Sequence, residues 1–203
     1  MYIPSHFAEN DLERLQQFIQ QRAFGALVVL TDNGLEANSI PFVLHPKQSV
    51  QGVLQGHVAR ANPVWQSFSA DVEAMVLFQG SDAYISPSWY PTKQEHGKVV
   101  PTWNYVAVHV YGKLSVREEA SWLYQHLNEL TMQHESHFEY PWQVDDAPKD
   151  FTDRLVGNIV GLEFQITKMV GKWKASQNQP EQNRAAVAQA LQENGNEMSK
   201  EIV

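Results

Sequence analysis

Two aromatic blocks between Gly80 and Gly112 combine flat rings with small polar side chains. The first reads AYISPSWY (83–90) and the second reads VPTWNY (100–105), with a short polar spacer between them. A flavin ring offers a flat face for stacking and an edge of carbonyls and nitrogens that form hydrogen bonds. The blocks therefore predict the wall of a site for a flat ligand of this kind. The candidate residues are Ser86, Ser88, Trp89, Thr102, Trp103 and Asn104.

The same blocks have a second interpretation, in which both tryptophans fill the core of a β-barrel. Trp and Tyr are common in strands because they pack well on a half-buried pleated surface. The polar residues favour the ligand site, because buried Ser, Thr and Asn side chains need hydrogen-bond partners. The sequence leaves both interpretations open.

The stretch GHVARANPVW (56–65) places a cation beside the expected start of a short helix. A guanidinium such as that of Arg60 can form two parallel hydrogen bonds to a phosphate. Asn62 is a candidate helix N-cap, and backbone N–H groups at a helix start attract anions. His57, Arg60 and Asn62 are therefore candidate ligands of an anion. The alternative is a surface turn with a helix cap and a solvated Arg.

A third candidate group is KASQN (174–178), which follows the last expected strand. Its Lys, Ser and amide side chains can form hydrogen bonds to a ligand edge or to a phosphate. Lys174, Ser176 and Gln177 are the candidate residues. The alternative is an ordinary linker between a strand and a helix.

Several familiar kinds of site are excluded by motifs that the chain lacks. There is no Cys, which excludes thiol catalysis, disulfides and Cys-ligated metal centres. Neither the GxGxxG nor the GxxxxGK[ST] phosphate-binding loop occurs, and the GxSxG motif is absent. His134 and His137 occur as HESH rather than HExxH, so no metal site is predicted.

Short strands must bring the three candidate groups together. Hydrophobic patterning and turn residues predict strands at 23–31, 35–42, 50–58, 73–80, 82–86, 103–116 and 161–173, with a hairpin turn at 32–34. Helices are predicted at 10–22, 62–68, 117–135 and 181–194. Because βαβ alternation is missing, we expect a mainly β fold with α: an antiparallel barrel with peripheral helices. We expect one domain over 1–178, then a C-terminal helix and a frayed tail over 179–203.

Composition and charge restrict the class of protein further. With 203 residues, 43% of them hydrophobic, the chain can bury the core of one domain. The net charge of −8 and the lack of a helix-turn-helix argue against DNA binding, which needs a basic face. No apolar run reaches the roughly 18 residues that span a bilayer, and no signal peptide is evident. We therefore expect a cytoplasmic protein that does not bind membranes.

Taken together, these motifs resemble the PaiB family, whose members are described as FMN-binding negative transcriptional regulators. The resemblance implies the split β-barrel of pyridoxamine-phosphate-oxidase-like proteins, a homodimer, and FMN near the subunit interface. It extends over nearly the whole chain. The stretches that carry it are MYIP (1–4), IPF (40–42), GHVARANPVW, AYISPSWY, VPTWNYVAVHVYG (100–112), IVGLEF (159–164) and KASQN.

The resemblance also implies roles for the candidate residues. Arg60 would face the FMN phosphate with His57 beside it, the aromatic blocks would line the ring and the ribityl chain, and KASQN would close the site. Two places depart from the pattern. Asn38 and Ser39 stand where we expect a His before the Ile-Pro-Phe, and Gln179 stands where we expect a basic residue. If these positions contact phosphate, FMN affinity is lower here than in the family.

Two classes of function follow from the resemblance. The first is an FMN-binding regulator that acts indirectly or through partners. The alternative is a flavin- or haem-dependent oxidoreductase, because split barrels also support such enzymes. FMN is the expected cofactor and haem the less favoured one. A third option is an interaction protein that has lost its flavin.

Overall fold

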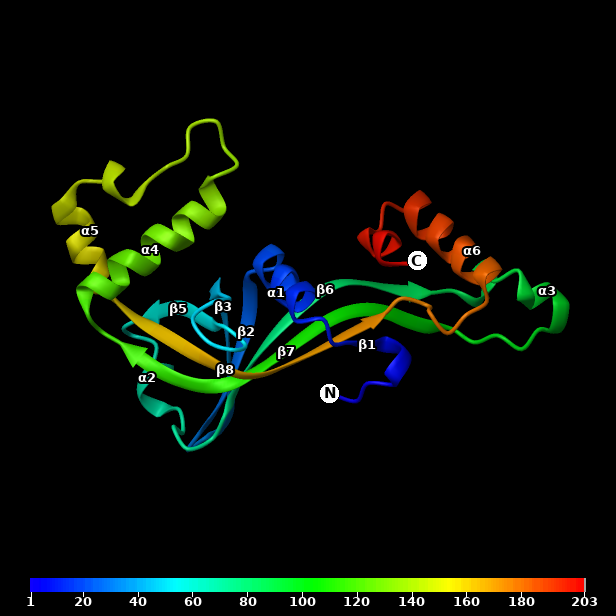
Figure 1. Ribbon diagram of the computed structural model, residues 1–203, viewed down its shortest axis with the longest axis horizontal. Coiled ribbons are helices and arrows are strands. Elements are labelled where there is room, and N and C mark those ends of the chain that lie inside the picture. Colours follow the sequence, from blue (N-terminus) through cyan, green and yellow to red (C-terminus); the bar gives the residue numbers. More distant parts are fainter. Residues whose placement is uncertain (203) are drawn as a thin grey trace. The chain divides into compact units, whose positions relative to one another are not determined.

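The computed structural model describes residues 1–202 and is built on eight strands (Figure 1). The strands are β1 (Ala8–Glu9), β2 (Phe24–Thr31), β3 (Gly34–Pro41), β4 (Val43–His45), β5 (Val53–Ala59), β6 (Ala74–Ile85), β7 (Thr102–Arg117) and β8 (Ile159–Lys174). The α-helices are α1 (Leu12–Gln21), α2 (Val64–Ser67), α3 (Thr92–His96), α4 (Ala120–Glu135), α5 (Lys149–Val156) and α6 (Glu181–Glu193). The 3-10 helices are η1 (Ser5–Phe7), η2 (Pro87–Trp89), η3 (Val144–Asp146) and η4 (Glu197–Glu201).

The strands form one sheet in the order β3-β2-β6-β7-β8-β5-β4, with β1 paired to β8. The pairs β2–β3, β2–β6, β4–β5 and β5–β8 are antiparallel. The two strands that we expected at 73–80 and 82–86 are a single strand, β6. The expected fold class, an antiparallel β structure with peripheral helices, is confirmed.

The chain divides into two compact units. Unit 1 comprises residues 1–11, 79–109 and those from 170 onward, and unit 2 comprises residues 12–78 and 110–169. Strands β6, β7 and β8 contribute residues to both units. The helix α6 belongs to unit 1.

Unit 2 contains the hairpin of β2 and β3. Every residue of β2 pairs with β3, from Phe24 opposite Pro41 to Thr31 opposite Gly34, which confirms the hairpin turn expected at 32–34. Gly34 has a φ of +104°, a conformation that residues with a side chain rarely adopt. Burial alternates along most of β2, as expected for a strand with one face on the core.

Two helices of unit 2, α1 and α4, pack through apolar side chains. Leu15, Phe18 and Ile19 of α1 are buried at the helical spacing that the sequence predicted. The α4 residue Trp122 lies directly over Gly161 of β8, where an added Cβ would be 2.3 Å from the Trp122 ring. Gly161 therefore allows α4 to approach the strand closely.

Unit 1 ends in α6 and η4. Val187, Leu191 and Met198 of this C-terminal stretch are buried, and Trp173 Nε1 of β8 donates to Glu201 at 3.1 Å. Our expectation of a frayed tail is wrong for 197–201, because the buried methionine and this hydrogen bond hold the segment in place.

Candidate functional site

The end of β6 and the start of β7 expose two aromatic rings in unit 1. Tyr84 is 48% exposed and Trp103 is 56% exposed. Their ring centroids lie 5.9 Å apart at an interplanar angle of 71°, an edge-to-face contact. Side chains alternate along a strand, so Trp103 and Tyr105 share one face of β7, and Thr102 and Asn104 share the other. The core interpretation is therefore wrong for Trp103.

A buried lysine adds a positive charge to this set of rings. Lys172 of β8 is 7% exposed, and its Nζ lies 5.0 Å from the centroid of the Tyr105 ring. The same Nζ donates to the backbone oxygen of Tyr2 at 3.2 Å. Aromatic faces attract cations through the ring quadrupole. The combination of exposed rings and a cation suits an anionic aromatic ligand. In the sequence, the available signal for this cation was that Lys172 lies two residues before Lys174 on the same strand.

Unit 1 also contains a cavity of about 140 Å³. A site for a drug-sized ligand usually has about 300–1,000 Å³, so this cavity accepts one edge or one end of a larger ligand. It brings four predicted site residues together from β7 and from the end of β8. The lining residues are Tyr90, Val100, Thr102, Asn104, Lys174, Ser176, Asn178 and Gln179.

Asn104 has unused hydrogen-bonding capacity in this cavity. Its side chain is 1% exposed, and Nδ2 donates to Ser176 Oγ at 2.8 Å. Its Oδ1 is buried and has no hydrogen-bond partner. A buried acceptor without a partner costs about 1–3 kcal/mol. A ligand N–H that reaches Asn104 Oδ1 would remove that cost.

Lys174 brings a second cation to the cavity. Its Nζ donates to the Trp103 backbone oxygen at 2.6 Å and also to the Thr102 hydroxyl. Burial lowers the pKa of the Lys174 ammonium, and the charge of Lys172 lowers that pKa further. An ammonium that has lost part of its hydration gains from a nearby anion, so Lys174 can bind a phosphate or an electron-rich ring edge.

The turn that contains Ser176 is held by Gln177. Its Oε1 accepts from the Ala175 N–H at 2.8 Å, and its Nε2 donates to the Trp173 backbone oxygen at 2.6 Å. Ser176 has a φ of +64°, and no other non-glycine among residues 1–202 has a positive φ. The predicted residue Gln177 therefore shapes the backbone that presents Ser176 to Asn104.

The polar residues of the first aromatic block form local contacts around η2. Ser86 Oγ accepts from the Ser88 N–H at 3.2 Å, and Ser88 Oγ accepts from Lys93 Nζ at 3.3 Å. Trp89 is half-buried, so it is not a core residue either. These side chains lie outside the lining of the cavity. Tyr90, the last residue of the same block, is buried against the cavity and was not among the individual candidate residues.

The structure places His57, Arg60 and Asn62 in unit 2, so the predicted residues form two sets. All three nitrogens of the Arg60 side chain donate hydrogen bonds. Nη1 donates to Glu118 at 2.7 Å, Nε to the Gly157 oxygen at 3.1 Å and Nη2 to the Ile159 oxygen at 3.2 Å. These bonds tie the end of β5 to the turn that precedes β8.

Asn62 is also bonded within the chain. Its Oδ1 accepts from the Val64 N–H at 2.9 Å at the start of α2, which agrees with the capping role that we expected. Its Nδ2 donates to Asn38 Oδ1 at 2.7 Å. Asn38 is one of the positions that depart from the PaiB pattern, and here it fixes the Asn62 side chain.

His57 contacts a completely buried histidine of α4. His57 Nδ1 lies 3.0 Å from His126 Nε2, and the His126 ring stacks on Trp122 with centroids 5.4 Å apart. Burial lowers the pKa of both imidazoles, and the charges of His57 and His45 help to lower the pKa of His126 to about 3.

The tautomer of His126 follows from its surroundings. His126 Nδ1 is buried without a partner, and a bare nitrogen there avoids burying an unpaired N–H. The proton is therefore assigned to Nε2, which donates to His57 Nδ1. His126 was not among the candidate residues predicted from the sequence. Its position three residues after Leu123, on the apolar side of α4, was the available signal.

Comparison with known proteins identifies the family. A family model described as "Putative FMN-binding domain" matches residues 1–168. The chain belongs to this family. It is 34% identical over 203 residues to the protease synthase and sporulation protein PAI 2 of Bacillus subtilis (strain 168), covering 100% of this chain and 94% of that protein. An uncharacterised protein of Emericella nidulans is 32% identical, covering 98% of this chain and 94% of its own. The PaiB resemblance is confirmed, and FMN is confirmed as the cofactor at the level of the family.

Solved structures with little sequence identity share the fold. The conserved hypothetical protein Rv2991 of Mycobacterium tuberculosis has a TM-score of 0.61 at 11% identity, covering 89% of this chain and 95% of that one. The flavocytochrome Anf3 of Azotobacter vinelandii has a TM-score of 0.61 at 8% identity, covering 91% and 78%. At such identities the likeness shows the fold alone. None of the helices within residues 1–202 has the length and apolar character needed to cross a membrane.

Proposed function

We propose that this member of the FMN-binding family is a cytoplasmic, homodimeric negative regulator of transcription that acts indirectly or through protein partners. The Bacillus subtilis relative is named for protease synthesis and sporulation, which are cellular processes rather than a single reaction. That name supports a regulator over an enzyme. The net charge of −8 supports an indirect action, because a DNA-reading surface needs cations that neutralise phosphates.

The residues of unit 1 fit FMN, and Asn104 is the observation that carries this proposal. A flavin ring has an N–H between two carbonyls on its edge, and Asn104 Oδ1 is a buried acceptor that lacks a donor. Lys174 supplies a cation at the cavity. Trp103, with Tyr84 against it, exposes its ring on the opposite face of β7, so these rings would stack on a flavin held by a second copy of the chain. When bound, FMN supplies one- and two-electron redox chemistry. The chain itself supplies the acceptor, the stacking surface and the cation.

Two cations compete for the role of phosphate ligand. The family resemblance assigns Arg60 to the phosphate, with His57 and Asn62 near it. In the structure the Arg60 guanidinium already binds Glu118 and two backbone oxygens. Lys174 lines a cavity and is partly desolvated, so we propose Lys174 rather than Arg60 as the phosphate ligand.

The homodimer is supported by the exposed rings of unit 1. Tyr84 and Trp103 lie on adjacent strands, and neighbouring exposed aromatic side chains commonly mark an interaction surface. A second copy that covers these rings would also exclude water from the flavin. Sedimentation velocity at micromolar concentration tests this part, and a monomer would contradict it.

The visible spectrum of the protein purified from cells tests the cofactor. Flavin bands are expected, and a Soret band would instead favour the haem-dependent oxidoreductase. In a titration followed by flavin fluorescence, Lys174→Met should weaken FMN binding by about tenfold, the scale of one charge-assisted hydrogen bond. Riboflavin, which lacks the phosphate, should bind both proteins alike if Lys174 binds phosphate.

The matched control is Lys200→Met, which removes an exposed lysine of the same unit. It should leave FMN binding unchanged. Absence of flavin bands, together with no response to added FMN, would overturn the proposed function. That result would favour the third option, an interaction protein without a flavin.

A further inference from the structure

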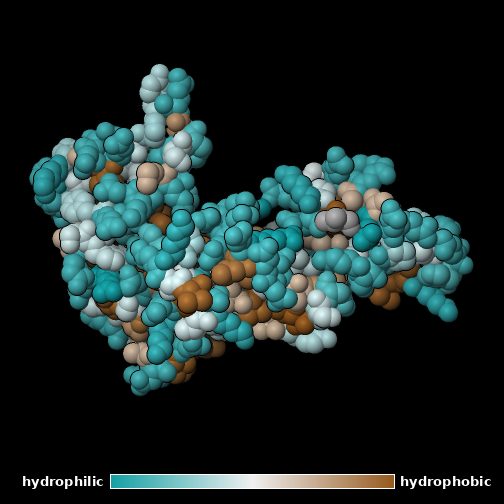
Figure 2. Space-filling view, in the orientation of Figure 1, coloured by the Kyte–Doolittle hydropathy of each residue, from teal (hydrophilic) through white to brown (hydrophobic). Residues whose placement is uncertain are grey.

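The charge of the chain is concentrated in one stretch of unit 2, residues 118–153, here called the acidic segment. It holds nine Asp or Glu residues and one lysine, a net charge of −8, which equals the net charge of the whole chain. The other residues therefore balance, with 14 acidic and 14 basic side chains. The segment comprises α4, η3, most of α5 and the loops between them. Figure 2 shows a mainly hydrophilic surface over these elements.

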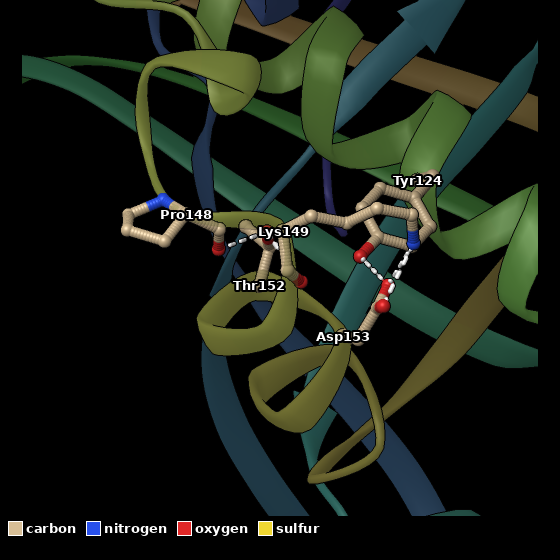
Figure 3. Close-up of polar contacts among 5 residues, drawn as sticks. All are labelled: Tyr124, Pro148, Lys149, Thr152 and Asp153. Carbon is tan, nitrogen blue, oxygen red and sulfur yellow. Dashed lines mark hydrogen bonds and ion pairs between the residues drawn. The ribbon is translucent and has the colours of Figure 1, made fainter.

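A hydrogen-bonded cluster ties the two helices of the acidic segment together (Figure 3). Tyr124 of α4 donates its hydroxyl to Asp153 of α5, and Lys149 Nζ donates to both carboxylate oxygens of Asp153 at 2.7 Å. The single lysine of the segment is thus bound to one of its own carboxylates. The acidic segment is held in shape, but Lys149 neutralises only Asp153, and Glu118 is paired with Arg60 from outside the segment.

The exposed acids of the segment lie on several of its elements. Glu119 precedes α4, Glu139 lies in the loop after α4, Asp145 is in η3 and Asp150 is in α5, and each of these residues is exposed. Like charges on one surface repel each other and raise the free energy of the folded state. A positively charged partner would relieve that repulsion.

The acidic segment also contains a cavity of about 480 Å³, between the second half of α4 and the following loop. Met132, Pro141 and Trp142 supply apolar walls, and Glu129 and Glu135 add carboxylates. Glu135 holds the loop in place, since its Oε2 accepts from the Trp142 N–H at 3.0 Å. The volume falls within the range of about 300–1,000 Å³ that is usual for ligand sites.

Large aromatic side chains outside the cavity extend this surface. Phe138 and Tyr140 of the same loop are exposed, and so is Phe151 of α5. Aromatic residues are enriched where proteins bind one another, and they also attract cations. A long cationic side chain, with an apolar stem and a charged end, fits an apolar groove with carboxylates on its wall.

We propose that the acidic segment is a docking surface for a Lys- and Arg-rich amphipathic segment of a protein partner. The groove takes apolar side chains and the stems of the cationic ones, and the carboxylates around it pair with the charged ends. The exposed acids extend from Glu119 to Asp150. A small amine bound in the cavity would not contact all of them, whereas a peptide segment could. Nucleic acids and anionic lipids are repelled by the same charges.

This surface is separate from the proposed flavin site in its residues. Every side chain of the docking surface belongs to unit 2, and the residues assigned to the flavin ring belong to unit 1. The docking proposal therefore does not depend on FMN. It adds one way in which an acidic protein could affect transcription through a partner: the acidic segment would bind the basic segment of that partner.

Fluorescence anisotropy of a labelled synthetic peptide tests the proposal on the full chain. The probe is a helical peptide with Lys and Arg on one face and Leu on the other. The control peptide has the same composition in an order that destroys the amphipathic pattern. The amphipathic peptide should bind about tenfold more tightly than the control peptide. Raising NaCl from about 0.05 to about 0.5 M should weaken the binding by about tenfold or more.

Matched variants separate this site from a general effect of charge. Asp145→Lys with Asp150→Lys should weaken peptide binding by about tenfold, whereas Asp32→Lys with Asp71→Lys, which reverses two exposed acids elsewhere in unit 2, should change it less than about twofold. Trp142→Ala should also weaken binding by about tenfold without changing FMN binding.

Three results would overturn the proposal. Equal losses from the two charge-reversed pairs would mean that only the net charge matters. Equal binding of the two peptides would mean that the groove does not take part. Dissociation of a homodimer by Trp142→Ala would mean that a second copy of this chain occupies the groove.

Discussion

The two sets of predicted ligand residues differ in how far their hydrogen-bonding capacity is used within the chain. In unit 2, the polar groups of Arg60, Asn62 and His57 are bonded to other protein groups. In unit 1, Asn104 keeps a buried acceptor without a partner, and Trp103 exposes its ring. Side chains with paired polar groups stabilise the fold, whereas an unpaired buried atom is available to a ligand. Asn62 and Asn104 therefore have different roles although they are the same residue type.

The largest predicted effect is a loss of stability in acid, which acts through the buried His126 of unit 2. The pKa of His126 is about 3 in the folded protein, against 6.5 in the unfolded chain, because burial disfavours the charged ring. The unfolded state therefore takes up the proton first as the pH falls below 6.5. Stability is fully present above that pH and decreases toward pH 3, with about 3 kcal/mol lost at about pH 4. Urea unfolding at several pH values measures the loss.

The variant His126→Phe keeps a ring against Trp122 but cannot titrate. Its stability should decrease less between about pH 7 and pH 4 than that of the wild type, even if it is lower at neutral pH. His137→Gln, which replaces an exposed histidine, should follow the wild type. Parallel curves for wild type and His126→Phe would contradict the assignment of the acid effect to this ring.

The substitution Arg60→Ala tests whether this side chain stabilises the fold or binds the ligand. It removes three hydrogen bonds, including one to Glu118, and should lower the free energy of unfolding by about 2 kcal/mol. The ratio of FMN to riboflavin affinity should stay the same. A selective loss of FMN binding would instead give Arg60 the phosphate role that the family resemblance implies. Arg154→Ala, at an exposed position of α5, is the control for stability.

Two tryptophans allow a reciprocal test of unit 1 against unit 2. Trp103→Ala should weaken FMN binding by on the order of 1–2 kcal/mol with a small change in melting temperature, because the ring is largely exposed. Trp142→Ala should leave FMN binding intact. If Trp103→Ala greatly lowers the melting temperature of the flavin-free protein, the ring belongs to the core after all.

The smallest effect is a gain of affinity at Gln179. This residue lines the unit 1 cavity where the family pattern has a basic residue. Gln179→Lys should tighten FMN binding by about 0.5–1 kcal/mol, a gain of two- to fivefold, and leave riboflavin binding unchanged. Gln189→Lys on the exposed side of α6 adds the same charge away from the cavity. An equal gain from both variants would show a long-range charge effect.

Local sequence patterns predict the helices and strands of this fold, but they predict the site only in part. The hairpin at 32–34 and the helices α1, α4 and α6 have clear turn residues or helical periodicity, so their positions were predicted within a few residues. The grouping of Asn104 with Ser176 depends on pairing far apart in the sequence, which no local pattern reports. The engagement of Arg60 by Glu118 is equally non-local, since 58 residues separate them.

Exposure was the other property that the sequence could not supply. Trp89 and Trp103 occur in similar motifs, yet one lies in a 3-10 helix and the other on an open strand face. Lys172 is a charged residue of β8, yet it is buried against Tyr105. Each outcome depends on which neighbour covers the side chain.

The left-handed backbone at Ser176 has a consequence for how this protein could change under selection. Glycine adopts a φ of +64° without the penalty of roughly 1 kcal/mol that a side chain incurs there. Yet glycine lacks the hydroxyl with which Ser176 accepts from Asn104. A laboratory evolution experiment that rewards heat tolerance alone should therefore exchange Ser176 for glycine, whereas one that also rewards flavin retention should keep the serine. Residue 176 would then show which of the two properties a population had been selected to keep.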